Sequence, residues 1–229
     1  MKKGKLIVLD GSDGSGKATQ TRFLLARLKK EGHRVKTLDF PQYEHNFFGK
    51  LIGQCLVGDY GDFVQIDPHI GSVLYAADRF ESKPVIERWL KQGYTIVLDR
   101  YVSSNQIHQG GKIRQPKRQR EFLKWLDTME HVVFGLPRPD SIIYLDVPTT
   151  ISQSLLKTED QKRKKVYVSK RKTDLVESDE EYMRRSRESA LKLVRQLNAW
   201  TKIVCTKRGV LLTREEIAEK VWDQVKKML

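Results

Sequence analysis

The chain has few cysteines for its length. Cys55 and Cys205 are the only two among 229 residues, and they lie far apart, in no spacing typical of a metal site. Small secreted domains and zinc modules depend on more numerous and regularly spaced cysteines. The sequence therefore argues against a disulfide scaffold or a zinc site, and it favours a reducing, cytoplasmic setting.

Long apolar runs are also missing. No run approaches the roughly 18 residues that a membrane-spanning helix needs. The opening Met1-Lys2-Lys3-Gly4 leads straight into a short strand-like run, unlike a secretory signal. The chain has no internal repeat and no Pro- or Ser-rich linker, so we expect residues 1–229 to form one domain without a membrane segment.

Acidic residues are in deficit. The chain has 43 Lys and Arg against 29 Asp and Glu, which gives a net charge of +14. An excess of this size points to an anionic partner. By itself it does not distinguish a nucleic acid, an acidic surface and a small phosphate ester.

Short apolar runs alternate along the chain with patterns of helical period. We expect strands at 5–9, 35–40, 94–98, 141–147 and 202–206, and helices at 17–30, 67–91, 115–130, 178–200 and 213–228. Ser178 with Glu181, and Thr213 with Glu216, have the spacing of capping boxes at the last two helices. Alternation of this kind predicts a doubly wound α/β fold with five parallel strands flanked by helices.

A glycine-rich segment lies between the first expected strand and the first expected helix. It reads Gly11-Ser12-Asp13-Gly14-Ser15-Gly16-Lys17-Ala18-Thr19. Glycines allow consecutive backbone N–H groups to point inward, and the start of the helix adds partial positive charge. The segment is therefore predicted to be a phosphate loop (P-loop), with Lys17 reaching the terminal phosphates of a nucleotide.

One position departs from the usual P-loop pattern. The hydroxyl residue expected directly after the lysine is replaced by Ala18, and Thr19 follows one place later. Ala18 has no oxygen to offer a magnesium ion. Two alternatives remain open: Thr19 supplies the hydroxyl, or Asp99 holds the metal through water together with the substrate phosphates.

Asp99 and Arg100 end the third expected strand. Ligands of parallel α/β sheets bind at the carboxyl ends of the strands. A carboxylate at that edge can organise magnesium, and the adjacent guanidinium can clamp a phosphoryl group in transfer.

With these residues in view, the chain resembles the thymidylate kinases, a family of P-loop nucleoside monophosphate kinases. The motifs that carry the resemblance are Asp13 with Thr19-Gln20, Phe40-Pro41-Gln42-Tyr43, Leu74-Tyr75-Ala76-Ala77-Asp78-Arg79-Phe80-Glu81, Asp99-Arg100-Tyr101-Val102-Ser103-Ser104-Asn105 with His108-Gln109-Gly110, and Leu145-Asp146-Val147-Pro148. They extend from about residue 4 to residue 205, which is most of the chain.

The resemblance implies a role for each matching residue. The implied thymidine monophosphate (dTMP) site consists of Asp13 on the sugar 3′-hydroxyl, Phe40 and Tyr43 beside the acceptor, Tyr75 stacked on the base, Arg79 donating to the base or acceptor phosphate region, Arg100 bridging acceptor and transferred phosphoryl, Ser104 and Asn105 at the base edge, and His108 near the 2′ position. Taken singly, Tyr75 could be a core residue, Arg79 a solvated helix residue and His108 an ordinary loop histidine.

The family also uses an arginine that closes over the phosphates. Some members carry it inside the P-loop, at the place of Gly14, and others carry it on a mobile lid. Eight Lys or Arg lie between Lys157 and Lys172. The resemblance therefore implies a basic lid at about 150–177, with Arg163 or Arg171 as the closing residue.

The implied reaction moves the γ-phosphoryl group of magnesium ATP to dTMP, giving dTDP and ADP, in a homodimer packed through helices such as the one that carries Tyr75. Besides a catalytically silent protein, which Ala18 suggests but the intact Lys17, Asp99 and Arg100 disfavour, two alternatives remain. One is a kinase for another deoxynucleotide, such as dUMP or dCMP, or for a deoxynucleoside. The other is a basic P-loop protein that binds nucleic acid through the stretches at 112–124 and 184–187, but the sparse aromatic residues near them disfavour it.

Overall fold

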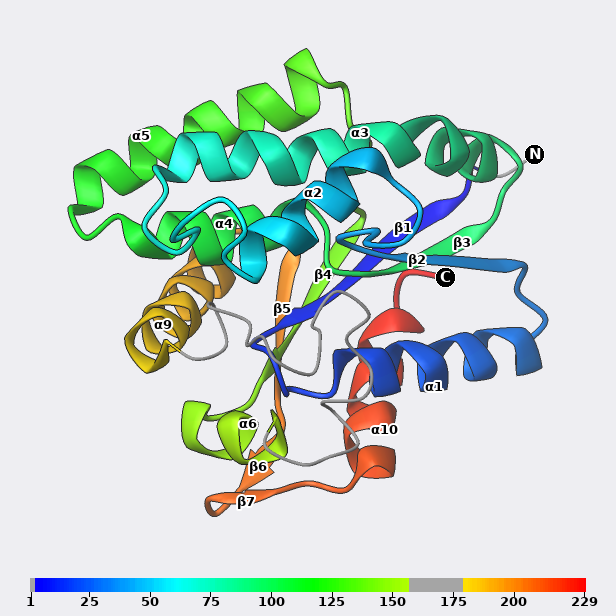
Figure 1. The fold of residues 1–229 in the computed structure, drawn as a ribbon. Coiled ribbons are helices and arrows are strands. Elements are labelled where there is room, and N and C mark those ends of the chain that lie inside the picture. Colours follow the sequence, from blue (N-terminus) through cyan, green and yellow to red (C-terminus); the bar gives the residue numbers. More distant parts are fainter. Residues whose placement is uncertain (1–2, 157–178) are drawn as a thin grey trace.

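The computed structural model describes residues 3–156 and 179–229 (Figure 1). Its strands are β1 (Lys5–Gly11), β2 (Val35–Asp39), β3 (Thr95–Asp99), β4 (Ser141–Asp146), β5 (Trp200–Val204), β6 (Thr206–Lys207) and β7 (Val210–Leu211). Its helices are α1 (Lys17–Lys30), α2 (Phe47–Leu56), α3 (Pro68–Lys91), α4 (Val102–Lys112), α5 (Pro116–Asp127), the π-helix η1 (Thr128–Val133), α6 (Thr149–Leu156), α9 (Glu180–Gln196) and α10 (Arg214–Val225).

The centre of the fold is a five-stranded sheet in the order β2-β3-β1-β4-β5. Every neighbouring pair in it is parallel. The predicted five-stranded parallel sheet flanked by helices is thus confirmed. β1 lies between β3 and β4, so the chain turns to opposite sides of β1, and this is where α/β sheets open a binding crevice.

Alternation along β1 explains how both faces of the sheet are covered. Leu6 and Val8 point into a core shared with α3, α4 and α9. Ile7 and Leu9 point to the other face, where α1 and α10 pack. Figure 1 shows the same arrangement, with α3 and α4 on one side of the strands and α1 and α10 on the other. A strand buried on both faces needs apolar residues at every position, which is why β1 is a continuous apolar run.

The second predicted capping box is confirmed at α10. The Thr213 hydroxyl accepts from the Glu216 backbone N–H, and the Glu216 carboxylate accepts from the backbone N–H of Thr213. Each of the two side chains satisfies a donor that the first turn of a helix leaves unpaired. Thr213 therefore marks the start of the last helix.

The predicted helix at 178–200 is wrong at both ends. Asp179, not Ser178, is the N-cap, because its carboxylate accepts from the backbone N–H of Tyr182. Glu181 pairs with Arg184 and Arg185 of its own helix, and its predicted capping-box partner Ser178 lies outside the described residues. At the other end α9 stops at Gln196, and the buried Trp200 begins β5 opposite Ile142.

Helices α2, α4 and α6 and the small β6–β7 hairpin were not anticipated. α2 and α4 lie beside predicted motifs, and their sequences are rich in glycine, serine and other weak helix formers. Tertiary packing stabilises such helices more than intrinsic propensity does. Among the described residues, no helix is both long enough and apolar enough to cross a bilayer.

Candidate active site

The predicted P-loop connects β1 to α1 as a tight turn. Gly14 and Gly16 adopt left-handed backbone conformations, with φ of 77° and 86°. A Cβ at Gly14 would lie 2.3 Å from the backbone oxygen of Ser152 in α6, so a side chain is excluded there. The N-cap of α1 is Gly16, which has no side chain to bind the first N–H groups of the helix. This backbone suits an anion at the helix N-terminus.

Lys17 opens α1 and is buried. Its Nζ donates to the carbonyl oxygens of Gly11 and Ser12, at 3.0 and 2.9 Å, and lies 3.8 Å from the Asp13 carboxylate. Burial and then the charge of Arg100 lower the pKa of Lys17. The ammonium is thus held over the loop by neutral carbonyls, and phosphate oxygens would be stronger acceptors for it.

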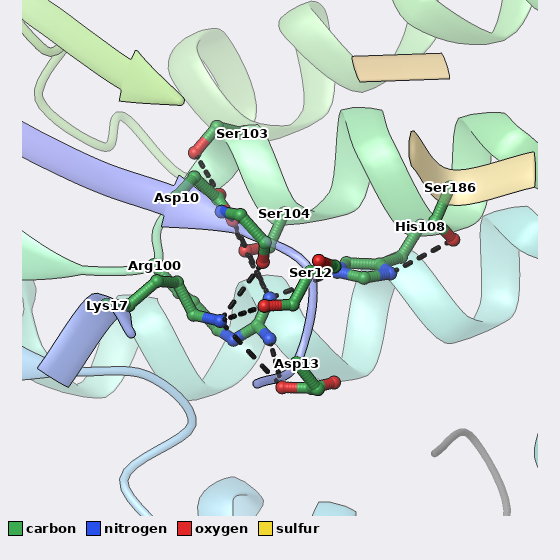
Figure 2. Close-up of polar contacts among 10 residues, drawn as sticks. Asp10, Ser12, Asp13, Lys17, Arg100, Ser103, Ser104, His108 and Ser186 are labelled. Carbon is green, nitrogen blue, oxygen red and sulfur yellow. Dashed lines mark hydrogen bonds and ion pairs between the residues drawn. The ribbon is translucent and has the colours of Figure 1, made fainter. Parts of the chain in front are cut away.

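Arg100 adopts a left-handed backbone conformation, with φ of 68°, directly after β3. Figure 2 shows its guanidinium lying between the Asp13 carboxylate and the His108 ring. Nη2 donates to Asp13, and Nη1 lies 3.0 Å from His108 Nε2 and 3.6 Å from Asp10 Oδ1. Although burial opposes the charge, Asp13 and Asp10 raise the pKa of Arg100. The arginine therefore stays cationic, and contacts from β1, the P-loop and helix α4 fix the orientation of its guanidinium.

Asp10 is a site residue that sequence reasoning missed. Its side chain is fully buried and accepts from Ser103 Oγ at 2.6 Å, from Ser104 Oγ at 2.8 Å and from the Gly11 backbone N–H at 2.8 Å. An acidic residue ending an apolar strand just before a P-loop was the available signal. Ser104 thus donates to Asp10 beside the P-loop, and its predicted role at the base edge stays a prediction.

Asp99 lies at the end of β3, within the fields of Lys17 and Arg100. Burial raises the pKa of its carboxyl to about 6, against the opposing charges of Lys17 and Arg100. Ala18 is exposed in the first turn of α1, and Thr19 beside it is half-buried. Carboxylate and hydroxyl oxygens suit Mg²⁺, which usually takes one or two protein carboxylates plus phosphate oxygens and water. The donors at this edge therefore fit magnesium.

The predicted base end of the site is lined by aromatic rings. Phe40 is buried, with its ring centroid 5.9 Å from that of Tyr101. Tyr75 is half-buried, 6.0 Å from Phe63, and Tyr43 packs in the same cluster. Little of the Phe40 ring is open to a ligand, whereas part of Tyr75 is.

Arg79 and Asn105 do not lie as the resemblance implied. Arg79 is 2 % exposed, and its Nε and Nη2 both donate to the carboxylate of Glu130, which is 0 % exposed. Asn105 Nδ2 donates to the same carboxylate at 2.7 Å and to the Ser72 carbonyl at 3.1 Å. Glu130 occupies two of the three nitrogens of Arg79, so the role predicted for Arg79 at the base or acceptor phosphate falls to Nη1 and stays a prediction.

Sequence reasoning also missed Glu130. It lies in η1, within a stretch expected to be ordinary helix, and the pattern around it gives no sign of an ion pair with α3. π-helical turns often occur at functional sites. Here the π-helical turn brings the Glu130 carboxylate into contact with Arg79 and Asn105, two residues predicted to bind dTMP.

Comparison with known proteins decides the family. A family profile described as thymidylate kinase matches residues 9–217. The chain belongs to the thymidylate kinase family. It is 34% identical over 146 residues to the thymidylate kinase of Homo sapiens and 34% identical over 145 residues to that of Arabidopsis thaliana. These matches cover 64% and 63% of this chain, but only 62% and 49% of the relatives, so the chain matches less than two thirds of their length.

The fold agrees with that of a solved member of the family. The structure titled "Structure of Thymidylate Kinase from Candida albicans Reveals Origin of Broad Substrate Specificity and a Novel Structural Element" superposes with a TM-score of 0.73 at 22% identity. The superposition covers 98% of this chain and 92% of that one. The likeness therefore concerns the fold of the whole chain.

The predicted lid of this thymidylate kinase family member falls mostly outside the described residues. Arg163 and Arg171 both lie in 157–178, and the choice between them stays a prediction. The first part of the predicted lid, 150–156, belongs to helix α6, which packs against Gly14 of the P-loop. At this place the structure shows a helix supporting the loop.

Proposed function

We propose that this protein is a thymidylate kinase that transfers the γ-phosphoryl group of ATP to dTMP, producing dTDP and ADP. The observation that carries the proposal is the joining of Lys17, Arg100 and Asp13 into one partly buried polar cluster at the start of α1 (Figure 2). Two cations at a helix N-terminus form a site for two phosphate-bearing ligands.

In the proposed reaction, substrate phosphates replace the protein groups that accept hydrogen bonds from Lys17 and Arg100 in the unliganded protein. Phosphate oxygens of ATP would replace the loop carbonyls on Lys17, and the dTMP phosphate would replace Asp13 on Arg100. Asp13 would then be available to the sugar 3′-hydroxyl. An acceptor phosphate is already a nucleophile at neutral pH, so the reaction needs alignment and charge neutralisation more than a general base.

Magnesium would be held by Asp99 with the phosphates, and Thr19 stands one residue beyond the usual position for a hydroxyl ligand. When bound, the ion would offset the negative charge of the phosphates. Burial raises the pKa of Asp99 to about 6, so its carboxyl is mainly ionised, and able to bind a cation, at neutral pH.

At the base end we propose that Tyr75 stacks on thymine, with Phe40 and Tyr43 forming the wall behind the acceptor. Asn105 would contact the base edge through the side of its amide that does not face Glu130. Both N–H groups of that amide are used by Glu130 and Ser72. The group left for the base is therefore the carbonyl oxygen, an acceptor.

The test compares Lys17→Ala and Arg100→Ala with the exposed controls Lys30→Ala and Arg195→Ala. Formation of ADP would be followed with dTMP, dUMP, dCMP, dGMP and dAMP. We expect dTMP to be the preferred acceptor, and each site variant to lower kcat/KM at least about a thousandfold without unfolding, whereas the controls retain the activity of the unmodified enzyme. Near-normal turnover by either site variant, or preference for another monophosphate, would contradict the proposal.

Binding of nucleic acid is the weaker alternative, because the three arginines of the stretch at 184–187 are already paired. Arg184 and Arg185 contact acidic residues of their own helix, and Arg187 contacts Asp146. Neutralised arginines contribute little to binding a phosphate backbone. We therefore propose small phosphate esters as the partners, in a cytoplasmic enzyme whose two cysteines are buried and free.

We further propose that two copies of the chain associate through α3. Ile70, Val73 and Phe80 are 55, 38 and 46 % exposed and share one stripe of that helix. A stripe of apolar residues on a helix surface marks a packing face. Light scattering should show a dimer, and Phe80→Glu should convert it to a monomer.

A further inference from the structure

His108 joins Arg100 to helix α9, and the proposed reaction gives this contact no role. The Nε2 atom of the imidazole lies 3.0 Å from Arg100 Nη1, and the Nδ1 atom lies 3.2 Å from Ser186 Oγ. Figure 2 shows the ring lying between the guanidinium and the serine. The three side chains come from the end of β3, from α4 and from α9.

The direction of these hydrogen bonds follows from their chemistry. A guanidinium only donates, so His108 Nε2 must be the acceptor. A neutral imidazole carries its single proton on the other nitrogen, so Nδ1 donates to Ser186 Oγ. The contact with Ser186 thereby selects the tautomer that can accept from Arg100.

The surroundings of His108 keep the ring neutral. Its ring stacks on Tyr182 of α9, with centroids 5.8 Å apart and planes 8° apart. Burial lowers the pKa of His108 to about 4. The charged groups acting on it are Arg100 and Lys17, which lower the pKa, and Asp13 and Asp10, which raise it. At neutral pH the acceptor on Nε2 is therefore present.

We propose that His108, oriented by Ser186, is a positioning residue that holds one terminal nitrogen of Arg100 while the other exchanges Asp13 for a substrate phosphate. This inference rests on the proposed phosphoryl transfer and adds to it how the arginine is kept in place. Without such a tether, a long arginine side chain must lose its rotamer freedom each time it meets the phosphate.

Three replacements of His108 separate this role from simple packing. His108→Phe keeps an aromatic ring against Tyr182 but removes the acceptor, and we expect kcat to fall about tenfold to hundredfold, as for a hydrogen bond to a charged group. His108→Gln places an oxygen near the former Nε2 and should recover most of the loss. His108→Asn reaches Ser186 but not Arg100, and should not recover it.

Ser186 is tested against a neighbour on the same helix. Ser186→Ala should lower kcat by about twofold to tenfold, because it removes a neutral hydrogen bond that selects the tautomer. Ser189→Ala is the matched control: it too is buried on α9, but its hydroxyl donates to the Gln106 carbonyl. The control should leave kcat within about twofold of the unmodified enzyme.

A spectroscopic measurement decides the inference without relying on turnover. Nitrogen-15 NMR of the unliganded protein at pH 7 should show His108 neutral, with its proton on Nδ1. A proton on Nε2, or a protonated ring, overturns the inference whatever the activity. If the expected tautomer is seen and the unmodified enzyme phosphorylates dTMP, equal kcat for His108→Phe also overturns it. If the unmodified enzyme phosphorylates no monophosphate, the proposed function fails, and the positioning role fails with it.

Discussion

Two arginines lie beside the proposed binding site, and their surroundings differ. Arg79 is 2 % exposed and gives two nitrogens to one carboxylate, that of Glu130. Arg100 has a side chain that is 15 % exposed and faces four acceptors, on Asp10, Asp13, Ser104 and His108. The first is a closed pair, and the second is a cation with several alternative partners.

The difference shows what each arginine can do. A buried pair of one cation and one anion is neutral, and removing either member leaves an uncompensated charge. Arg100 can release Asp13 to a ligand and still be held by Asp10 and His108. Whether a charged side chain can exchange one partner for a ligand thus depends on how many acceptors surround it, and not on its charge alone.

The largest expected difference is in stability. Arg79→Ala should lower the free energy of unfolding by about 3–5 kcal/mol, because it leaves Glu130 charged and buried. Arg100→Ala should lower it by less than about 1 kcal/mol, because Asp13 is partly solvated and Asp10 keeps its serine donors. Urea denaturation at pH 7 measures both. Equal losses would remove the distinction between a closed pair and an exchangeable cation.

A double-mutant cycle sharpens the description of the closed pair. Glu130→Leu alone should be strongly destabilising, whereas Glu130→Leu combined with Arg79→Met should recover stability, with a coupling energy of about 2–3 kcal/mol. The measurement is the free energy of unfolding of the four proteins. Additive losses would show that the two side chains act independently.

A smaller effect concerns the carboxyl near Arg100. Burial raises the pKa of Asp99 to about 6 from an ordinary 3.8, so the folded state holds its proton more tightly than the unfolded state does. The resulting stabilisation is full below about pH 4 and is lost as the pH rises through 6. In the Asp99→Asn variant, the free energy of unfolding should fall less between pH 4 and pH 7 than in the unmodified protein, by a difference of about 1 kcal/mol or more. Thermal unfolding across this pH range measures the difference.

The exposed Asp59→Asn serves as the control for that experiment. It should reproduce the pH profile of the unmodified protein. If Asp99→Asn keeps the same dependence between pH 4 and 6, a different group carries it.

Much of the fold was predictable because its signals are local. The apolar run of β1 and the Thr213 capping box depend on neighbouring residues alone. The start of α9 was misplaced because Ser178 and Asp179 both suit an N-cap, and local pattern did not choose between them. Weak helices such as α2 and α4 depend on packing that the sequence does not display.

The residues of the site also fall into those with a local sequence signal and those that depend on packing. The P-loop, Asp99 and Arg100 are contiguous with strand ends, so their meeting at one edge of the sheet could be expected. The pairing of Arg79 with Glu130 joins residues far apart in the chain, and it depends on the π-helical turn of η1. Such a pairing has no local signal, so the sequence of α3 alone did not reveal that Arg79 contacts Glu130.

The packing of α6 against the P-loop limits how this chain can evolve. At residue 14 a side chain would need a left-handed backbone and would collide with the Ser152 carbonyl. A substitution that introduced a P-loop arginine would therefore disrupt the loop before it could assist transfer. Gly14→Arg alone would therefore not convert this chain to the form of the family that carries its arginine in the P-loop, because helix α6 would first have to move away. One close contact, between residue 14 and the Ser152 carbonyl, thus closes the P-loop position to an arginine in this chain.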